Sequence, residues 1–149
     1  MAGGRLKIEY GRKVMTFEDL ESWKHARQLA RDIYSLTRDD VVVRDFGLCG
    51  QVQRAAVSTM SNIAEGFERQ HVQEKIQFYS VAGGSNAEVR SLTYVIEDNF
   101  PTLAAEALQL REKSVQTGKL VTGLIRSTES RKSKIAGLLS SISHLLSPV

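Results

Sequence analysis

Proline is nearly absent from this chain, and its absence limits the fold more than any other feature of the sequence. Only Pro101 and Pro148 occur among 149 residues. Because proline removes a backbone N–H donor and clashes with the preceding helical turn, a long stretch without it permits long helices. Hydrophobic residues make up 42% and charged residues 25%, as in ordinary soluble globular domains. The sequence therefore predicts one compact domain of the all-α class.

Apolar residues recur at three- and four-residue steps in four long segments, which is the period of an amphipathic helix. Thr16 can cap the first segment, and Thr102 can cap the fourth directly after Pro101. Short connections join the segments, so they predict an antiparallel up-and-down four-helix bundle over residues 16–126. The predicted helices cover residues 17–38, 45 to the polar region at 66–71, 72–98, and 102–126.

The third predicted helix is apolar on two faces. A helix of this kind is buried on both sides, which is easiest when one face packs inside the protomer and the other meets a second protomer. The pattern therefore predicts self-association. One face carries Phe78, Val81, Ala82, Val89, Leu92, Val95 and Ile96, and the opposite face carries Ile76, Tyr79 and Tyr94.

The first fifteen residues lie outside the predicted bundle. Leu6, Ile8 and Tyr10 alternate with charged residues, which fits one strand or no regular structure. Residues 1–15 are therefore predicted to be a flexible extension, and Met15 is an alternative start of translation. Removing residues 1–14 is expected to change the free energy of unfolding by less than about 1 kcal/mol.

Residues 127–149 form a second extension, in which a polar stretch at 127–134 interrupts the fourth helix. Six aliphatic residues then repeat at helical spacing opposite serines, as a short fifth helix or a continuation of the fourth. The segment lacks the aromatic and basic residues of membrane-surface helices, so we expect docking on the bundle or on a neighbouring protomer rather than on a membrane. The six residues are Ile135, Leu138, Leu139, Ile142, Leu145 and Leu146.

Residue types that carry catalysis and metal binding are sparse and scattered. Cys49 is the only cysteine, and His25, His71 and His144 lie in separate segments, so we predict neither a disulfide nor a zinc-type site. No apolar run approaches the roughly 20 residues of a membrane span, and the N-terminus lacks the apolar stretch of a secretory signal. We therefore expect a cytoplasmic protein that has no catalytic residues and no cofactor.

Four cations of the first predicted helix fall within an arc of about 60° beside its apolar face. Trp23 and Tyr34 border the same edge. Cations beside aromatic rings can hold a phosphate backbone and stack on bases, so this arc is a candidate nucleic-acid-binding site. The alternative is a solvated helix face next to a core tryptophan. The arc consists of Lys24, Arg27, Arg31 and Arg38.

A second polar set follows one ridge of the second predicted helix and continues on the third. Small and charged side chains at helical spacing suit a close, hydrogen-bonded contact with another helix. Glu88 is expected to pair with Arg54, because a bare carboxylate on an apolar side is costly. We therefore predict helix packing or oligomerisation at these positions. They are Arg54, Ser58, Ser61 and Glu65 on the second helix, and Gly84, Ser85 and Glu88 on the third.

Four short segments in this order resemble a known bacterial family. They are Phe-Glu-Asp-Leu-Glu-Ser-Trp-Lys at 17–24, Gln-Val-Gln-Arg-Ala-Ala-Val-Ser at 51–58, Ser-Asn-Ile-Ala-Glu-Gly-Phe at 61–67 and Gly-Ser-Asn-Ala-Glu at 84–88. The sequence is thereby similar to the four-helix-bundle family of the 23S ribosomal RNA intervening-sequence protein. This family is related to the accessory variability proteins of diversity-generating retroelements.

The resemblance implies a ring-like homopentamer of up-and-down bundles, and it attaches no enzymatic activity to the family. The retroelement relatives are basic pentamers that bind nucleic acid and a reverse transcriptase. We therefore expect a non-catalytic oligomeric bundle that binds RNA, DNA or a nucleoprotein partner, such as a reverse transcriptase, through basic surfaces. The alternative is a protein-only assembly or scaffold module. Nucleic-acid binding is favoured over the scaffold function if the arc and the basic residues at the two chain ends line one surface of the oligomer.

Overall fold

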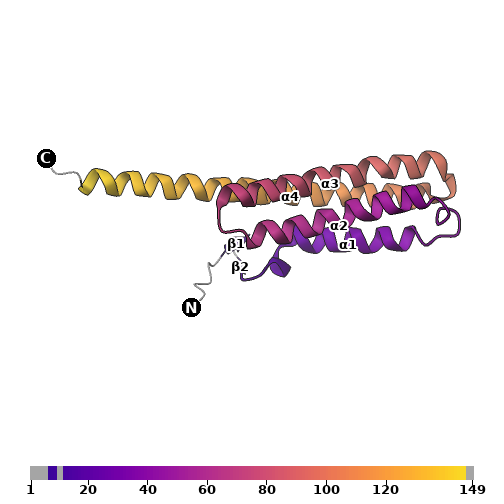
Figure 1. The fold of residues 1–149 in the computed structure, drawn as a ribbon, viewed down its shortest axis with the longest axis horizontal. Coiled ribbons are helices and arrows are strands. Elements are labelled where there is room, and N and C mark those ends of the chain that lie inside the picture. The colour runs from indigo at the N-terminus through magenta and orange to yellow at the C-terminus, as the bar shows by residue number, and fades with distance from the viewer. Residues whose placement is uncertain (1–6, 10–11, 147–149) are drawn as a thin grey trace.

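Four helices make up most of the computed structural model, which describes residues 7–9 and 12–146. They are α1 (Glu21–Leu36), α2 (Phe46–Glu68), α3 (Val72–Asn99) and α4 (Ala104–Leu146). Successive helices pack against each other, and α1 also packs against α4, which closes the bundle. The chain runs up and down in an elongated molecule (Figure 1). The predicted all-α helical bundle is confirmed.

The first helix begins later than its pattern predicts. Phe17–Asp19 form a short 3-10 helix, η1, and Leu20 is extended before α1 starts at Glu21. Thr16 precedes η1, as expected for a capping residue, and the Asp19 carboxylate accepts hydrogen bonds from the backbone N–H groups of Met15 and Thr16 at 2.9 and 3.1 Å. These bonds favour the charged carboxylate, so the pKa of Asp19 lies below its ordinary value of 3.8.

The buried face of α3 combines residues from both of the predicted faces. Tyr79 is fully buried at 1% exposure, whereas Val81 and Val95 are exposed by 48% and 40%. The predicted grouping into two faces is therefore wrong in part, because Tyr79 shares the core with residues of the other predicted face and Val81 and Val95 lie outside it. The buried residues still recur at three- and four-residue steps, and they are Tyr79, Ala82, Asn86, Val89, Leu92, Thr93 and Ile96.

Buried polar contacts between α3 and α4 explain this difference. The Asn86 side-chain amide donates to the carbonyl oxygen of Ser114 at 2.9 Å, and the Ser114 hydroxyl lies 3.1 Å from both the backbone and the side-chain oxygen of Asn86. Because its polar atoms are satisfied, Asn86 can occupy a core position that a hydrophobic pattern leaves unmarked. Gly118 keeps the helices close, since a Cβ there would lie 3.0 Å from the Asn86 amide nitrogen.

The fourth helix is continuous over 43 residues, so the predicted interruption at 127–134 is absent. Serine, threonine and lysine are polar but do not break a helix, and the Thr128 hydroxyl bonds the carbonyl oxygen of Leu124 at 2.8 Å. Figure 1 shows α4 running on alone past the ends of the other three helices. Within the bundle one side of α4, the core-facing seam, is buried. The seam consists of Ala107, Leu110, Ser114, Thr117, Val121, Leu124 and Thr128.

Residues 133–146 form the projecting part of α4, called the tail. Its six aliphatic side chains, the tail stripe defined by Ile135, Leu138, Leu139, Ile142, Leu145 and Leu146, are exposed by 49 to 84%. The expected docking on the protomer's own bundle does not occur in the described structure. In the part of the chain that is described, no helix is long and apolar enough to span a membrane.

A short hairpin precedes the bundle. Strands β1 (Lys7–Glu9) and β2 (Arg12–Val14) pair antiparallel, with Lys7 opposite Val14. Two strands therefore stand where the alternation predicted one strand or none, although Leu6 and Tyr10 lie outside the described residues. Val14 is 1% exposed and belongs to the core cluster that includes Leu20. The last residue of the hairpin is thus part of the folded domain.

Candidate functional site

Three of the four predicted arc cations line one hollow on the outer side of α1. Trp23, Lys24, Arg27, Gln28 and Arg31 form the walls of this α1 hollow, which has a volume of about 430 Å³. They follow one another at helical spacing, so two turns of a single helix build the whole feature. The hollow combines three cations, one amide and one aromatic ring.

Local contacts fix the tryptophan and one arginine in this hollow. The Phe17 ring meets Trp23 edge-on at 5.1 Å between centroids, and the Arg27 guanidinium lies 5.7 Å from the Trp23 centroid. Lys24 forms an ion pair with Glu21 at 2.9 Å, with both side chains more than 40% exposed. Among the described residues, neither Arg27 nor Arg31 forms an ion pair with a carboxylate. These two guanidinium groups are the cations that the hollow offers to an anion.

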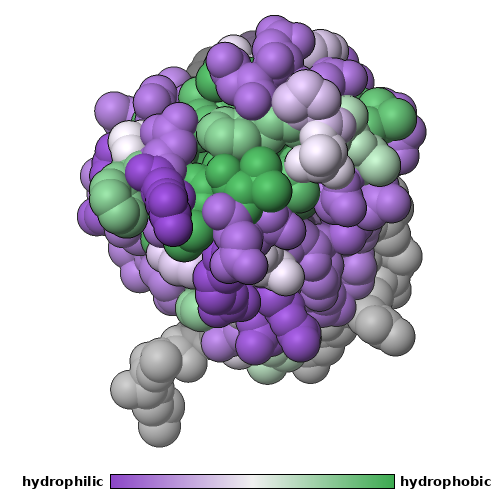
Figure 2. All heavy atoms as spheres, turned by 90° about the vertical axis from the view of Figure 1, so that its right-hand side faces the viewer, coloured by the Kyte–Doolittle hydropathy of each residue, from purple (hydrophilic) through white to green (hydrophobic). Residues whose placement is uncertain are grey.

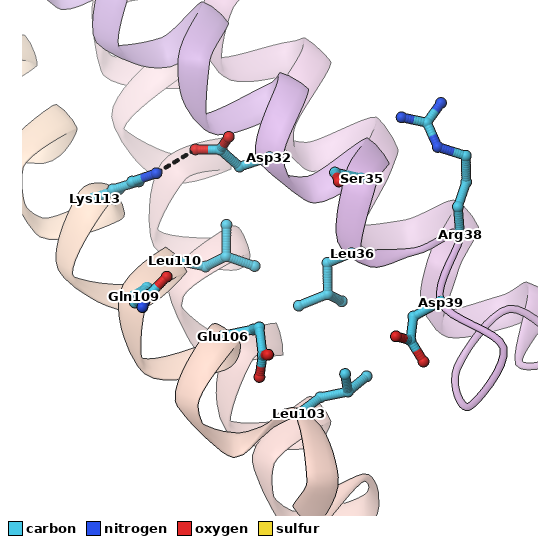
Figure 3. Close-up of a pocket in the computed structure, with 10 residues that line it drawn as sticks. All are labelled: Asp32, Ser35, Leu36, Arg38, Asp39, Leu103, Glu106, Gln109, Leu110 and Lys113. Carbon is cyan, nitrogen blue, oxygen red and sulfur yellow. Dashed lines mark hydrogen bonds and ion pairs between the residues drawn. The ribbon is translucent and has the colours of Figure 1, made fainter.

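Arg38 lies apart from the other three arc cations, on the turn after α1. It borders a hollow of about 550 Å³ between α1 and α4. Asp32 pairs with Lys113 across this hollow at 2.5 Å, and Asp39 and Glu106 add carboxylates to its wall (Figure 3). Three carboxylates there outnumber the two cations, Arg38 and Lys113, so this second hollow differs in charge from the first.

Basic residues of α4 gather near the tail but away from the α1 hollow. Residues 119–134 carry five cations and one carboxylate, counting Lys and Arg against Glu129. The walls of the α1 hollow come from α1 alone, so these cations do not contribute to it. The cations of residues 119–134 therefore form a surface separate from the α1 hollow.

The second polar set meets at the contact between α2 and α3. The hydroxyl oxygens of Ser58 and Ser85 lie 2.8 Å apart, and the Asn62 amide donates to the Ser58 hydroxyl at 3.1 Å. Ser61 donates to the carbonyl oxygen of Ser58 at 3.4 Å. We call the outward surface around this contact the α2–α3 face. It carries Arg54, Ser58, Ser61 and Glu65 on α2, and Val81, Gly84, Ser85 and Glu88 on α3.

The expected ion pair between Glu88 and Arg54 does not form among the described residues. Glu88 is exposed and accepts a hydrogen bond from the Gln51 amide at 3.3 Å, while Arg54 folds back toward Gly50. An exposed carboxylate stays hydrated and needs no ionic partner. Glu65 pairs instead with Arg69 at 3.7 Å on the same helix end. A Cβ at Gly84 would meet nothing within 4 Å, so in one protomer this glycine opens onto solvent.

Sequence reasoning missed a cluster between α3 and α4. The Arg111 guanidinium stacks 3.5 Å from the Tyr94 ring centroid, donates to the Thr93 hydroxyl at 3.1 Å and pairs with Glu97. These residues come from two helices, so no spacing along one helix could have revealed them. Arg111 is mostly buried, and its contacts within the protomer make it part of the packing between α3 and α4.

Two further observations concern metal ligands and the thiol among the described residues. No group of three or more histidine, cysteine or acidic side chains is placed there to hold a metal ion. Cys49 is buried, and its thiol donates to the carbonyl oxygen of Val42 at 3.3 Å. Burial raises the pKa of this thiol, and the nearby Asp45 carboxylate raises it further.

The end of the bundle opposite the tail shows a third kind of surface. Figure 2 looks onto this end and shows apolar side chains within a polar surround. Phe46 is exposed by 81% at the start of α2, and Val41 and Val43 are exposed in the preceding connection. Apolar surface is thus exposed at this end of the bundle as well as along the tail stripe.

Comparison with known families gives one match. Residues 18–123 match the family described as 23S rRNA-intervening sequence protein. This range covers α1, α2, α3 and the first part of α4, and it stops before the tail. No match was found among curated proteins.

Proposed function

The chain belongs to the family of 23S rRNA-intervening sequence proteins, and from that premise we propose that it is a non-catalytic, self-associating bundle that binds the phosphate backbone of RNA or DNA through the α1 hollow. The observation that carries this proposal is the pair Arg27 and Arg31. Both are exposed in the hollow beside Trp23, and neither is neutralised by a described carboxylate.

The chemistry of the hollow suits a phosphate backbone and one adjoining base. Guanidinium groups bind phosphate oxygens and release the counterions that surround a nucleic acid, so affinity depends steeply on salt. The partly exposed Trp23 ring offers a stacking surface worth roughly 1–3 kcal/mol per base. One hollow supplies few cations, and we therefore expect weak binding by a single protomer.

Self-association through the α2–α3 face would combine several weak binding sites into one assembly with a higher overall affinity. In a homopentamer, as the sequence resemblance implies, five copies of the α1 hollow would act on one strand. Linked sites raise the overall affinity because each further contact is intramolecular. A nucleoprotein such as a reverse transcriptase complex would bind to the same hollows through the phosphate backbone of its nucleic acid.

Trp23 is the only tryptophan, so its fluorescence reports on the hollow directly. We expect a single-stranded RNA to change this fluorescence when it binds. The logarithm of the association constant should fall linearly with the logarithm of the salt concentration. Changing Arg27 and Arg31 to glutamate should weaken binding at least about tenfold and lower the salt slope by about two. The matched control changes Arg44 and Arg90 to glutamate, which alters the net charge equally but away from the hollow.

Two results would contradict nucleic-acid binding at this site. One is the absence of binding by the unaltered protein to RNA or duplex DNA at about 50 mM salt. The other is an equal loss of affinity in both double variants, which would show only a response to net charge.

A protein-only scaffold is the second candidate, and the excess of carboxylates around Arg38 favours it. Asp32, Asp39 and Glu106 would repel a phosphate from that hollow, so the arc as a whole is not uniformly basic. Assembly without any nucleic-acid binding in the titration above would establish this candidate.

A further inference from the structure

The tail stripe is an apolar surface that no described residue covers. Leu138 and Leu139 are exposed by 64% and 63%, and Leu145 by 84%. The stripe lies beyond residue 123, outside the range that matches the family. A surface of this kind needs an occupant, because leaving so many aliphatic side chains in water is unfavourable.

The stripe faces the side of α4 on which the bundle lies. With residues about 100° apart, its centre lies within about 50° of the centre of the core-facing seam. Ile135, Leu138, Ile142 and Leu145 also continue the alternating three- and four-residue steps of that seam. A helix that covers the stripe would therefore occupy the space into which α1, α2 and α3 would extend if they were longer (Figure 1).

We propose that the occupant is the tail of a second copy of this chain, packed antiparallel. The two stripes are identical, so each can cover the other across a two-fold axis. Isoleucine and leucine alternate along the stripe at heptad spacing, as in helices that interlock side chains with a partner helix. The inference concerns the tail alone and goes beyond the proposed function of the bundle.

Sterics select the antiparallel arrangement. Each bundle lies on the stripe side of its own α4. In a parallel pair both bundles would therefore occupy the same space. In an antiparallel pair the second bundle lies beyond the tip of the first tail. The two bundles are then separated by the length of the tail, about 20 Å for fourteen residues at 1.5 Å each.

Charge favours the same arrangement. Arg131, Lys132 and Lys134 stand at the base of the tail, and an antiparallel pair places them beside the C-terminal end of the partner helix. The last carbonyl groups of a helix carry negative partial charge and attract cations. A parallel pair would instead bring the two basic clusters together.

The area is sufficient for a specific contact. At about 100 Å² for each aliphatic side chain, the two stripes would bury on the order of 1,000 Å² together. The opposite side of the tail carries Ser133, Gly137, Ser140 and His144. A helix that lies on an anionic membrane needs cations along that side, so the second copy is the occupant that the chemistry supports.

Light scattering of the full chain at micromolar to submillimolar concentration tests the pairing. Changing Leu138 and Ile142 to glutamate should halve the mass of the assembly. This result is expected whatever number of protomers associate through their bundles. Both side chains are exposed, so the helical circular dichroism and the melting of the bundle should not change. The control changes Ser133 and Ser140 to glutamate on the opposite side and should keep the original mass.

Disulfide formation tests the orientation in a Cys49→Ala background. An antiparallel pair predicts mixed disulfides between an Ile135→Cys protein and a Leu145→Cys protein when the two are combined. Disulfides only between identical variants would overturn the antiparallel arrangement. An unchanged mass in the stripe variant would overturn the pairing itself, as would sedimentation of the unaltered protein with vesicles of equal phosphatidylcholine and phosphatidylglycerol.

Discussion

At the scale of single residues, Gly66 sets how closely α2 approaches α3. A Cβ at this position would lie 2.6 Å from the Tyr79 ring and 3.0 Å from the Phe78 Cβ. Tyr79 is fully buried and cannot move aside without disturbing the core. We expect Gly66→Ala to lower the free energy of unfolding by about 1–3 kcal/mol, despite a gain in helix propensity of about 1 kcal/mol.

Gly83→Ala is the matched control in urea denaturation. Gly83 also lies inside a helix, but a Cβ there would meet only the Val121 side chain at 3.8 Å, an ordinary van der Waals distance. This variant should be stabilised by up to about 1 kcal/mol. Equal effects of the two substitutions would show that close approach is unimportant at Gly66.

Asp19 makes the stability of the N-terminal turn depend on pH. Hydrogen bonds from the N–H groups of Met15 and Thr16 lower the pKa of Asp19, so the carboxylate contributes stability above its ordinary pKa of 3.8. This contribution is lost as the pH falls through the lowered pKa. We expect Asp19→Asn to reduce the acid dependence of the unfolding free energy between about pH 5 and pH 2.

Urea titrations across this pH range give the measurement, and Glu18→Gln provides the control. Glu18 lies in the same turn and forms no hydrogen bond in the described structure with either N–H group. Its removal should leave the acid dependence close to that of the unaltered protein. If Asp19→Asn behaves in the same way, the two hydrogen bonds do not contribute to stability.

At the scale of elements, β2 links the N-terminal segment to the core through Val14. The side chain is 1% exposed among core residues, which revises the expectation that residues 1–14 contribute little. We expect Val14→Ala to cost about 1–3 kcal/mol in the free energy of unfolding, and deletion of residues 1–14 to cost at least as much. Met15→Ala is the control, because Met15 is 56% exposed. A deletion that costs less than Val14→Ala would contradict this role of Val14.

Periodicity predicted the number and order of the bundle helices and most of their ends, apart from the predicted interruption of α4 at 127–134, because the repeat of buried positions follows directly from helical geometry. It could not predict which of two neighbouring apolar stripes of α3 faces inward. That choice depends on Asn86, whose polar atoms are satisfied by Ser114 on another helix. The same limit applies to candidate sites. Lys24, Arg27 and Arg31 share a hollow because they lie on one helix, whereas contacts such as Arg111 with Tyr94 need the folded bundle.

At the scale of the whole molecule, the candidate surfaces point to different partners. The α1 hollow is basic, the α2–α3 face is a mixture of small, polar and aliphatic side chains, and the tail stripe is apolar. Separate surfaces can act at once, so one protomer can contact its neighbours and still expose its cations. Closed symmetric assemblies use such a division, since each subunit buries the same surfaces and presents the same remaining ones.

The last prediction concerns assembly through the α2–α3 face. Val81 is 48% exposed there, beside Gly84 and Ser85, and a charge at its centre would oppose burial against a second protomer. We expect light scattering of the unaltered protein to give at least five times the protomer mass of 16.6 kDa, and Val81→Arg to reduce the assembly to species smaller than a pentamer. Leu108→Arg is the matched control, because Leu108 is 47% exposed on α4, outside this face. If both variants assemble like the unaltered protein, the bundles do not meet through Val81, and the exposed valines of α3 are simply solvated.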